Sequence, residues 1–183
     1  FYEMGSGAST DIAKVALAQN CSEDSRYECD HICIDPFHPA DKTKESVTNF
    51  QVMEKPVEEV AISIFSDLVE NDILFIDSSH IIRPGGDVLR EYLEILPSLN
   101  PGVVVHIHDI FSPKHYLQRW MTEDVLFWNE QYLLEAFLTQ NSQWEVCLAL
   151  NYLCKNSYQD LKRCCPLLRE DSEPGSLWIE SKI

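Results

Sequence analysis

Short runs of hydrophobic residues alternate along this chain with longer segments in which hydrophobic residues recur every three or four positions. The first pattern predicts buried β-strands, and the second predicts helices that bury one face. The predicted strands cover residues 1–3, 31–34, 50–53, 73–76, 103–107, 144–150 and 176–179. The predicted helices begin at Ser9 and cover 57–69, 87–96 and 127–138. This alternation is typical of α/β proteins, in which helices flank a mostly parallel sheet.

The length of 183 residues suits a single domain with a sizeable core. We therefore expect residues 1–183 to form one domain. The polar residues 151–175, between the last two predicted strands, are expected to form an insertion on its surface. Because Phe1-Tyr2-Glu3 resembles the end of a strand, we also expect the domain to lack some N-terminal residues.

Acidic residues outnumber basic ones in this chain. Lys and Arg number 14 and Asp and Glu number 30, so the formal charge is −16. A negative field repels phosphate backbones and anionic lipids, which predicts no nucleic-acid partner and no membrane partner. The seven cysteines form no C-x-x-C pair, no apolar run reaches about 20 residues, and no signal peptide is visible. These features favour a reducing compartment, and we expect a cytoplasmic protein.

Polar and glycine residues follow the first two predicted strands. The turn Glu3-Met4-Gly5-Ser6-Gly7 comes directly after the first strand, and its two glycines let the backbone approach a ligand closely. Asp35 follows the second strand, where a carboxylate can accept hydrogen bonds from ribose hydroxyls. Glu3, Gly5, Ser6, Gly7 and Asp35 are therefore predicted to bind a cofactor that contains adenosine.

Two kinds of cofactor fit this pattern, and the residues around the turn favour one of them. A nicotinamide dinucleotide needs a third glycine beside its pyrophosphate, and the corresponding position is Thr10. Glu3 would also be poorly placed beside a pyrophosphate, whereas it suits the cationic amino-acid group of S-adenosylmethionine. The sequence thus favours S-adenosylmethionine, with an NAD(P)-dependent oxidoreductase as the alternative.

Carboxylates and imidazoles follow two further strands, in the segments that contain Asp77 and His80 and then His108 and Asp109. Asp77 and Asp109 could bind a hard cation such as Mg²⁺. His80 or His108 could instead take the proton from a substrate hydroxyl. We therefore predict His108, Asp109 and His80 as catalytic residues, and Asp77 and Asp109 as candidate metal ligands.

Four motifs in this order resemble a known family. They are E-x-G-S-G-x-S-T at residues 3–10, I-D-P at 34–36, F-I-D-S-S-H at 75–80 and H-I-H-D-I-F at 106–111. The chain resembles class I S-adenosylmethionine-dependent methyltransferases, closest to methyltransferase domain 24 of the bacterial small-molecule type. The resemblance implies a three-layer, doubly wound, mostly parallel sheet of seven strands with an antiparallel final strand. It also implies methyl transfer to a small molecule, and the imidazoles favour a hydroxyl as the acceptor group.

The resemblance also assigns roles to individual residues. It places Gly5 and Gly7 against the amino-acid part of the cofactor, Met53 and Glu54 beside the adenine, and Asp77 at the methionine end or at a metal. Metal-dependent members usually have Asn after the second aspartate, where this chain has Ile110.

Two further expectations concern partners. A non-catalytic protein that keeps the cofactor fold and binds a partner through its acidic surface is a further alternative to an enzyme. We also expect that the chain could form a homo-oligomer.

Overall fold

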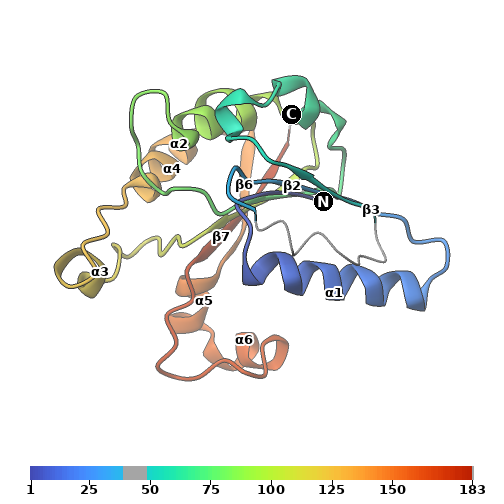
Figure 1. Cartoon of the computed structure of the whole chain (residues 1–183). Coiled ribbons are helices and arrows are strands. Elements are labelled where there is room, and N and C mark those ends of the chain that lie inside the picture. The colour runs from blue at the N-terminus through green and yellow to red at the C-terminus, as the bar shows by residue number, and fades with distance from the viewer. Residues whose placement is uncertain (39–48, 183) are drawn as a thin grey trace.

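The computed structural model describes residues 1–38 and 49–182. Within these residues the chain forms one sheet of seven strands in the order β3-β2-β1-β4-β5-β7-β6 (Figure 1). The strands are β1 (Tyr2–Met4), β2 (Asp30–Ile34), β3 (Asn49–Met53), β4 (Ile73–Ile76), β5 (Val104–His108), β6 (Trp144–Ala149) and β7 (Ser176–Ser181). Neighbouring strands from β3 to β5 are parallel, whereas β7 is antiparallel to both β5 and β6. The predicted mostly parallel sheet with an antiparallel final strand is confirmed.

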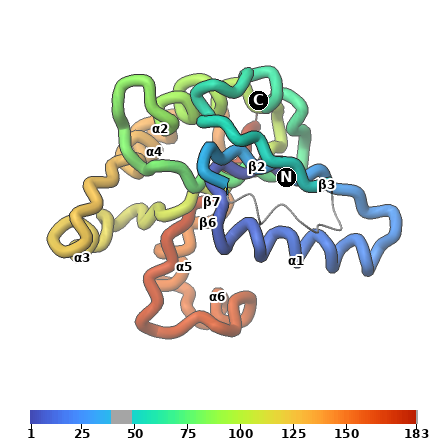
Figure 2. Tube along the Cα trace, in the orientation of Figure 1, coloured from blue at the N-terminus to red at the C-terminus, as the bar shows by residue number. Residues whose placement is uncertain are grey.

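Helices cover both faces of the sheet. One face carries η2 (Val57–Glu59), η3 (Ile62–Asp67), α2 (Asp87–Arg90), η4 (Glu91–Ile95), η5 (Leu96–Ser98) and α4 (Glu130–Leu138). The other carries α1 (Ala8–Glu23) and α5 (Leu150–Asn156), as the tube in Figure 2 also shows. This arrangement confirms the three-layer, doubly wound fold. No helix in residues 1–38 or 49–182 is long and apolar enough to cross a membrane.

The core lies between the sheet and the helices on the α2–α4 side. Leu74, Ile76, Val105 and Ile107 alternate along β4 and β5 and are completely buried on that face. Because side chains alternate between the two faces of a strand, this one pattern fixes the direction of every residue in β4 and β5. The polar residues that follow these strands are therefore held at one edge of the sheet.

The segment 57–69 is not one helix, as its pattern predicted, but two 3₁₀-helices. Val60 and Leu68 each end one of them with an extended backbone, although both side chains are buried. Several residues of this segment are β-branched, which lowers helix propensity, and short 3₁₀ turns still bury the same side chains.

Two helix starts also differ from the prediction. Helix α1 begins after Gly7, not Ser9, which places Thr10 in its first turn. Helix α4 begins at Glu130 rather than near residue 127, because the carbonyl of His80 accepts hydrogen bonds from the Asn129 and Glu130 amides.

The excursion between β6 and β7 contains α5 and α6 (Tyr158–Cys164) and returns to the sheet through Glu173. The Glu173 carboxylate lies 2.8 Å from Lys155 Nζ and 3.2 Å from Lys114 Nζ, and it accepts a hydrogen bond from Asn151. A further helix, α3 (Gln118–Thr122), which the sequence pattern did not predict, projects from the chain after β5 (Figure 1).

Candidate cofactor and catalytic site

The glycine turn after β1 lies between the ends of two neighbouring strands. Gly5 has a φ of +83°, and a Cβ atom there would lie 2.2 Å from the carbonyl oxygen of Asp77. Its amide donates a hydrogen bond to Ile34 O on the other side. Gly7 is extended, with open space where a Cβ atom would lie. The turn therefore requires glycine at Gly5 but not at Gly7.

Glu3 lies beneath this turn and is completely buried. Its Oε1 atom is 2.8 Å from His31 Nε2, and its Oε2 atom accepts a hydrogen bond of 3.1 Å from the Thr10 hydroxyl. The same hydroxyl accepts a hydrogen bond from the Gly7 amide. Glu3 is completely buried, both of its carboxylate oxygens have partners inside the protein, and it holds the turn in place. Its burial argues against the predicted contact with the cofactor.

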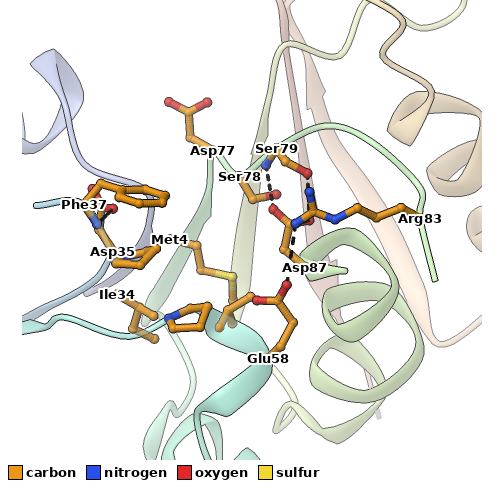
Figure 3. Close-up of a pocket in the computed structure, with 14 residues that line it drawn as sticks. Met4, Ile34, Asp35, Phe37, Glu58, Asp77, Ser78, Ser79, Arg83 and Asp87 are labelled. Carbon is orange, nitrogen blue, oxygen red and sulfur yellow. Dashed lines mark hydrogen bonds and ion pairs between the residues drawn. The ribbon is translucent and has the colours of Figure 1, made fainter. Parts of the chain in front are cut away.

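A cavity of about 530 Å³ opens at the ends of β1, β2 and β4 (Figure 3). This volume is typical of small-molecule sites. Asp35 lines it and is held by two donors, the Ser6 hydroxyl and the Phe37 amide at 2.7 Å. An ionised carboxylate accepts up to about four hydrogen bonds, so Asp35 can still accept ligand hydroxyls. The cavity is lined by Met4, Gly5, Ile34, Asp35, Pro36, Phe37, Pro56, Val57, Glu58, Asp77, Ser78, Ser79, Arg83 and Asp87.

The opposite wall of the cavity is a network of polar groups after β4 (Figure 3). The amide and hydroxyl of Ser79 both donate to the Asp87 carboxylate, at 2.8 and 2.7 Å. The Arg83 guanidinium lies 3.7 Å from Glu58 and 3.8 Å from Asp87. These contacts hold the loop after β4 against η2. Ser79, Arg83, Asp87 and Glu58 were not among the predicted site residues.

Met53 and Glu54, predicted beside the adenine, do not line the cavity. The chain turns sharply after β3, where the Lys55 amide donates to Met53 O at 2.7 Å. The residues of this loop that line the cavity are Pro56, Val57 and Glu58.

The four predicted residues that follow β4 and β5 lie together. Oxygen or nitrogen atoms of Asp77, His108 and Asp109 lie within 4.8 Å of one another. His80 Nε2 lies 3.2 Å from Asp77 Oδ1 and 3.9 Å from Asp109 Oδ2. His80 and Asp109 both have positive φ values, of 60° and 55°. Strained backbone of this kind is concentrated at functional sites.

His80 is buried and has acidic partners on both ring nitrogens. Its Nδ1 atom lies 2.7 Å from Oε2 of Glu130, which is completely buried and also accepts a hydrogen bond from the Tyr92 hydroxyl. Burial alone would lower the pKa of His80, but the hydrogen bonds to Asp77 and Glu130 raise it to about 10. With this pKa His80 is charged at neutral pH, which argues against its predicted role as a base. The roles of Glu130 and Tyr92 were missed, because neither residue follows a strand.

His108 is the accessible imidazole of this cluster, with 38% of its side chain exposed. Its Nδ1 atom lies 3.1 Å from Nε2 of His106. Burial and the neighbouring His108 lower the pKa of His106 to about 3, so His106 stays neutral. His106 is also held by its ring, which stacks on Phe75 at 4.3 Å. The His108 ring is thus fixed on one side and accessible on the other.

The two aspartates of the cluster differ in acidity. Burial opposes ionisation of Asp77, but its hydrogen bond from His80 and the nearby imidazoles lower its pKa overall. Burial and the charge of Asp77 raise the pKa of Asp109. Neighbouring carboxyl groups whose pKa values are shifted apart are a common feature of catalytic sites.

The strand order, the reversed β7 and the cavity at the carboxyl ends of β1, β2 and β4 define the class I S-adenosylmethionine-dependent methyltransferase fold. A family model described as a methyltransferase domain matches residues 2–110, more than half of the chain. The chain therefore belongs to this methyltransferase domain family. No curated protein sequence gives a significant match.

Two solved structures resemble the chain. The structure of LepI in complex with SAM has 11% sequence identity and a TM-score of 0.54, over all of this chain and 43% of that one. This chain thus spans less than half the length of LepI. A mutant of the 16S rRNA (adenine(1408)-N(1))-methyltransferase from Catenulisporales acidiphilia has 12% identity and a TM-score of 0.43, over all of this chain and 83% of that one.

Proposed function

We propose that this protein transfers a methyl group from S-adenosylmethionine to a hydroxyl group of a small molecule. One observation carries the proposal. Asp77 lines the cavity at the ends of β1, β2 and β4, and it also belongs to the cluster with His108 and Asp109. A cofactor in the cavity and an acceptor beside His108 would therefore be neighbours.

The cavity residues fit the chemical parts of S-adenosylmethionine. Asp35 would accept hydrogen bonds from the ribose hydroxyls. Because Gly5 has no side chain, the amino-acid part of the cofactor would have room beside the turn. Val57 and Glu58 would lie along the adenine, and the apolar Ile34 would pack against it. When bound, the cofactor supplies an electrophilic methyl group on a sulfonium.

The acceptor side needs a group that takes a proton, because a hydroxyl loses its proton when its oxygen is methylated. Of the two histidines predicted for this task, His80 is already protonated at neutral pH. His108 is accessible and oriented by His106, so we assign the role of proton acceptor to His108. The positive charge of His80 would keep Asp77 ionised and in a fixed position.

A divalent cation such as Mg²⁺ is the alternative way to lower the proton affinity of the hydroxyl. The spacing of Asp77, His108 and Asp109 supports it. The charged ring of His80, 3.2 Å from Asp77 and 3.9 Å from Asp109, opposes it by electrostatic repulsion. Methyl transfer that is abolished by a chelator and restored by Mg²⁺ would establish the metal, and transfer that is unaffected would exclude it.

The first turn of α1 weakens the case for a nicotinamide dinucleotide. Pyrophosphates bind the free amides at a helix N-terminus. Here the Gly7 amide already donates to the Thr10 hydroxyl. The overall charge of −16 supports a small-molecule acceptor over a nucleic acid, and it equally suits a non-catalytic protein with an acidic binding surface.

Formation of S-adenosylhomocysteine with a panel of phenols and alcohols tests the proposal. His108→Gln should lower the rate by about 100-fold or more, the usual contribution of a general base, and should leave cofactor affinity unchanged. His115→Gln, at an exposed histidine in the segment after β5, is the matched control. Equal rates for His108→Gln and the wild type would exclude His108 as the proton acceptor.

A further inference from the structure

A second hollow lies outside the cofactor cavity, between α3 and the chain that returns from α6 to β7. It is a groove of about 630 Å³. One wall is formed by residues 117–120, which include Arg119 and Trp120, and the other includes Arg169, Asp171 and Glu173.

Two arginines and two carboxylates line the groove. Its two carboxylates are already paired, Asp171 with Arg169 at 3.1 Å and Glu173 with Lys114 and Lys155. Among the residues that the structure describes, Arg119 has no such partner. All six arginines of the chain lie in the described residues, and the other five each have a carboxylate within 4.0 Å. Arg119 is thus the guanidinium that is free to pair with a ligand.

The segments that form the two walls of the groove meet at the edge of the sheet beside Asp109. The Asp109 amide donates a hydrogen bond of 2.8 Å to Gly175 O, so the two segments that lead to the groove walls leave the sheet from the same point. A Cβ atom at Gly175 would lie 2.7 Å from the Phe111 ring and 3.0 Å from Asp109 Cα, which shows how closely the two segments approach. The two segments that form the groove walls therefore also pack together at Asp109, beside His108.

Aromatic rings link the groove to the same site. Trp120 lies on the groove, and its ring is 4.9 Å from that of Trp128. The Trp128 ring in turn lies 4.3 Å from the ring of His80. Half-buried tryptophan rings bind flat aromatic ligands well, because they combine a large apolar area with a specific stacking geometry.

We propose that this groove binds the methyl acceptor, and that the acceptor is an aromatic molecule with an anionic group. The anionic group pairs with Arg119, the aromatic ring packs on Trp120, and the hydroxyl lies toward His108. This inference rests on the proposed function, since it names the class of molecule that the methyltransferase site receives. A planar guanidinium suits a carboxylate, with which it forms two parallel hydrogen bonds.

A matched pair of probes tests this assignment. 6-Hydroxy-2-naphthoate carries the anionic group and a hydroxyl at opposite ends of a flat aromatic ring, and 6-hydroxy-2-naphthamide lacks only the charge. Calorimetry should show that the wild type binds the carboxylate more tightly than the amide. Arg119→Gln should weaken carboxylate binding by about five- to tenfold and leave the amide unchanged. Arg119→Lys, which keeps the charge, should recover part of the loss.

Arg163→Gln is the control, because Arg163 is an exposed arginine of α6 that pairs with Asp160 outside the groove. It should bind both probes as the wild type does. Carboxylate affinity that is the same in the wild type and in Arg119→Gln would overturn the inference, as would failure of the wild type to bind either probe.

Titration of the same proteins with S-adenosylhomocysteine separates the two proposals. If S-adenosylhomocysteine binds and Arg119 has no effect on the naphthoate, the groove assignment fails and the proposed function stands. If Arg119 controls naphthoate binding but S-adenosylhomocysteine does not bind, the proposed function fails and the anion site stands.

Discussion

The edge of the sheet has two halves that are built in different ways. The half proposed to bind the cofactor, around Gly5, Ser6 and Asp35, depends on a backbone turn and on contacts with neutral donors. The half proposed for catalysis, around His80 and Asp77, depends on buried charges that come from distant segments. The structure of the first half thus depends on the shape of the backbone, whereas that of the second depends on the balance of buried charges.

This difference has consequences for mutation. An added side chain destabilises a turn such as that at Gly5, because the backbone has no space to move. Removal of one charge from a buried ion pair such as His80–Glu130 destabilises the protein, because the other charge then stays buried without that partner. The two halves should therefore respond to different substitutions.

The largest effect is expected at the turn. Gly5→Ala forces a Cβ atom toward the Asp77 carbonyl in a backbone conformation that alanine avoids. We expect it to lower the free energy of unfolding by about 3 kcal/mol and to abolish cofactor binding. Gly7→Ala is the matched control, since its Cβ atom meets open space, and it should melt within a few degrees of the wild type. Similar melting temperatures for the two variants would show that the Gly5 contact is unimportant.

The next effect is expected in the charged half. Glu130→Gln keeps the shape of the side chain and removes the charge that faces His80. Denaturant unfolding should show a loss of about 3 kcal/mol, because the buried imidazolium would lose its nearest carboxylate. Glu135→Gln, at an exposed residue of the same helix, should cost less than 1 kcal/mol. Equal losses for the two variants would contradict the buried ion pair.

A smaller effect on stability, but a clear one on binding, is expected at Asp35. Asp35→Asn removes an anionic acceptor that already has two protein donors. Calorimetry with S-adenosylhomocysteine should show a 10- to 100-fold weaker affinity, as expected for the loss of hydrogen bonds to a charged group. The exposed Asp24→Asn should bind like the wild type. An Asp35→Asn protein with unchanged affinity would separate Asp35 from the cofactor.

The smallest effect is a dependence of stability on pH. The pKa of His80 is raised from 6.5 to about 10 in the folded protein. Its contribution to stability is therefore complete below about pH 6.5 and is lost as the pH rises toward 10. Between pH 7 and pH 8 the free energy of unfolding should fall by about 1 kcal/mol more in the wild type than in His80→Gln. Parallel pH profiles for the two proteins would mean that His80 is neutral.

The sequence predicted the sheet and the region of the site because both depend on local signals. Strands such as β4 and β5 are short hydrophobic runs, and parallel strands of one sheet place their carboxyl ends at the same edge. Gly5, Asp35 and Asp77 could therefore be assigned to a common edge before the structure was known.

The remaining features depend on contacts that no local pattern records. Glu3 was predicted to contact the cofactor because it ends a strand, but its carboxylate lies beside the His31 ring, 28 residues away. His80 was predicted to be a base, but the carboxylate of Glu130, 50 residues away, lies beside its Nδ1 atom. The pKa of a buried group depends on such distant partners, so sequence spacing alone cannot predict it.

Calorimetric titration of the wild-type protein with S-adenosylhomocysteine, and separately with NADH and NADPH, tests the central claim most directly. We expect one S-adenosylhomocysteine to bind per chain, through Asp35, and neither dinucleotide to bind. Binding of a dinucleotide without S-adenosylhomocysteine, or affinity for S-adenosylhomocysteine that is unaffected by Gly5→Ala and Asp35→Asn, would contradict it.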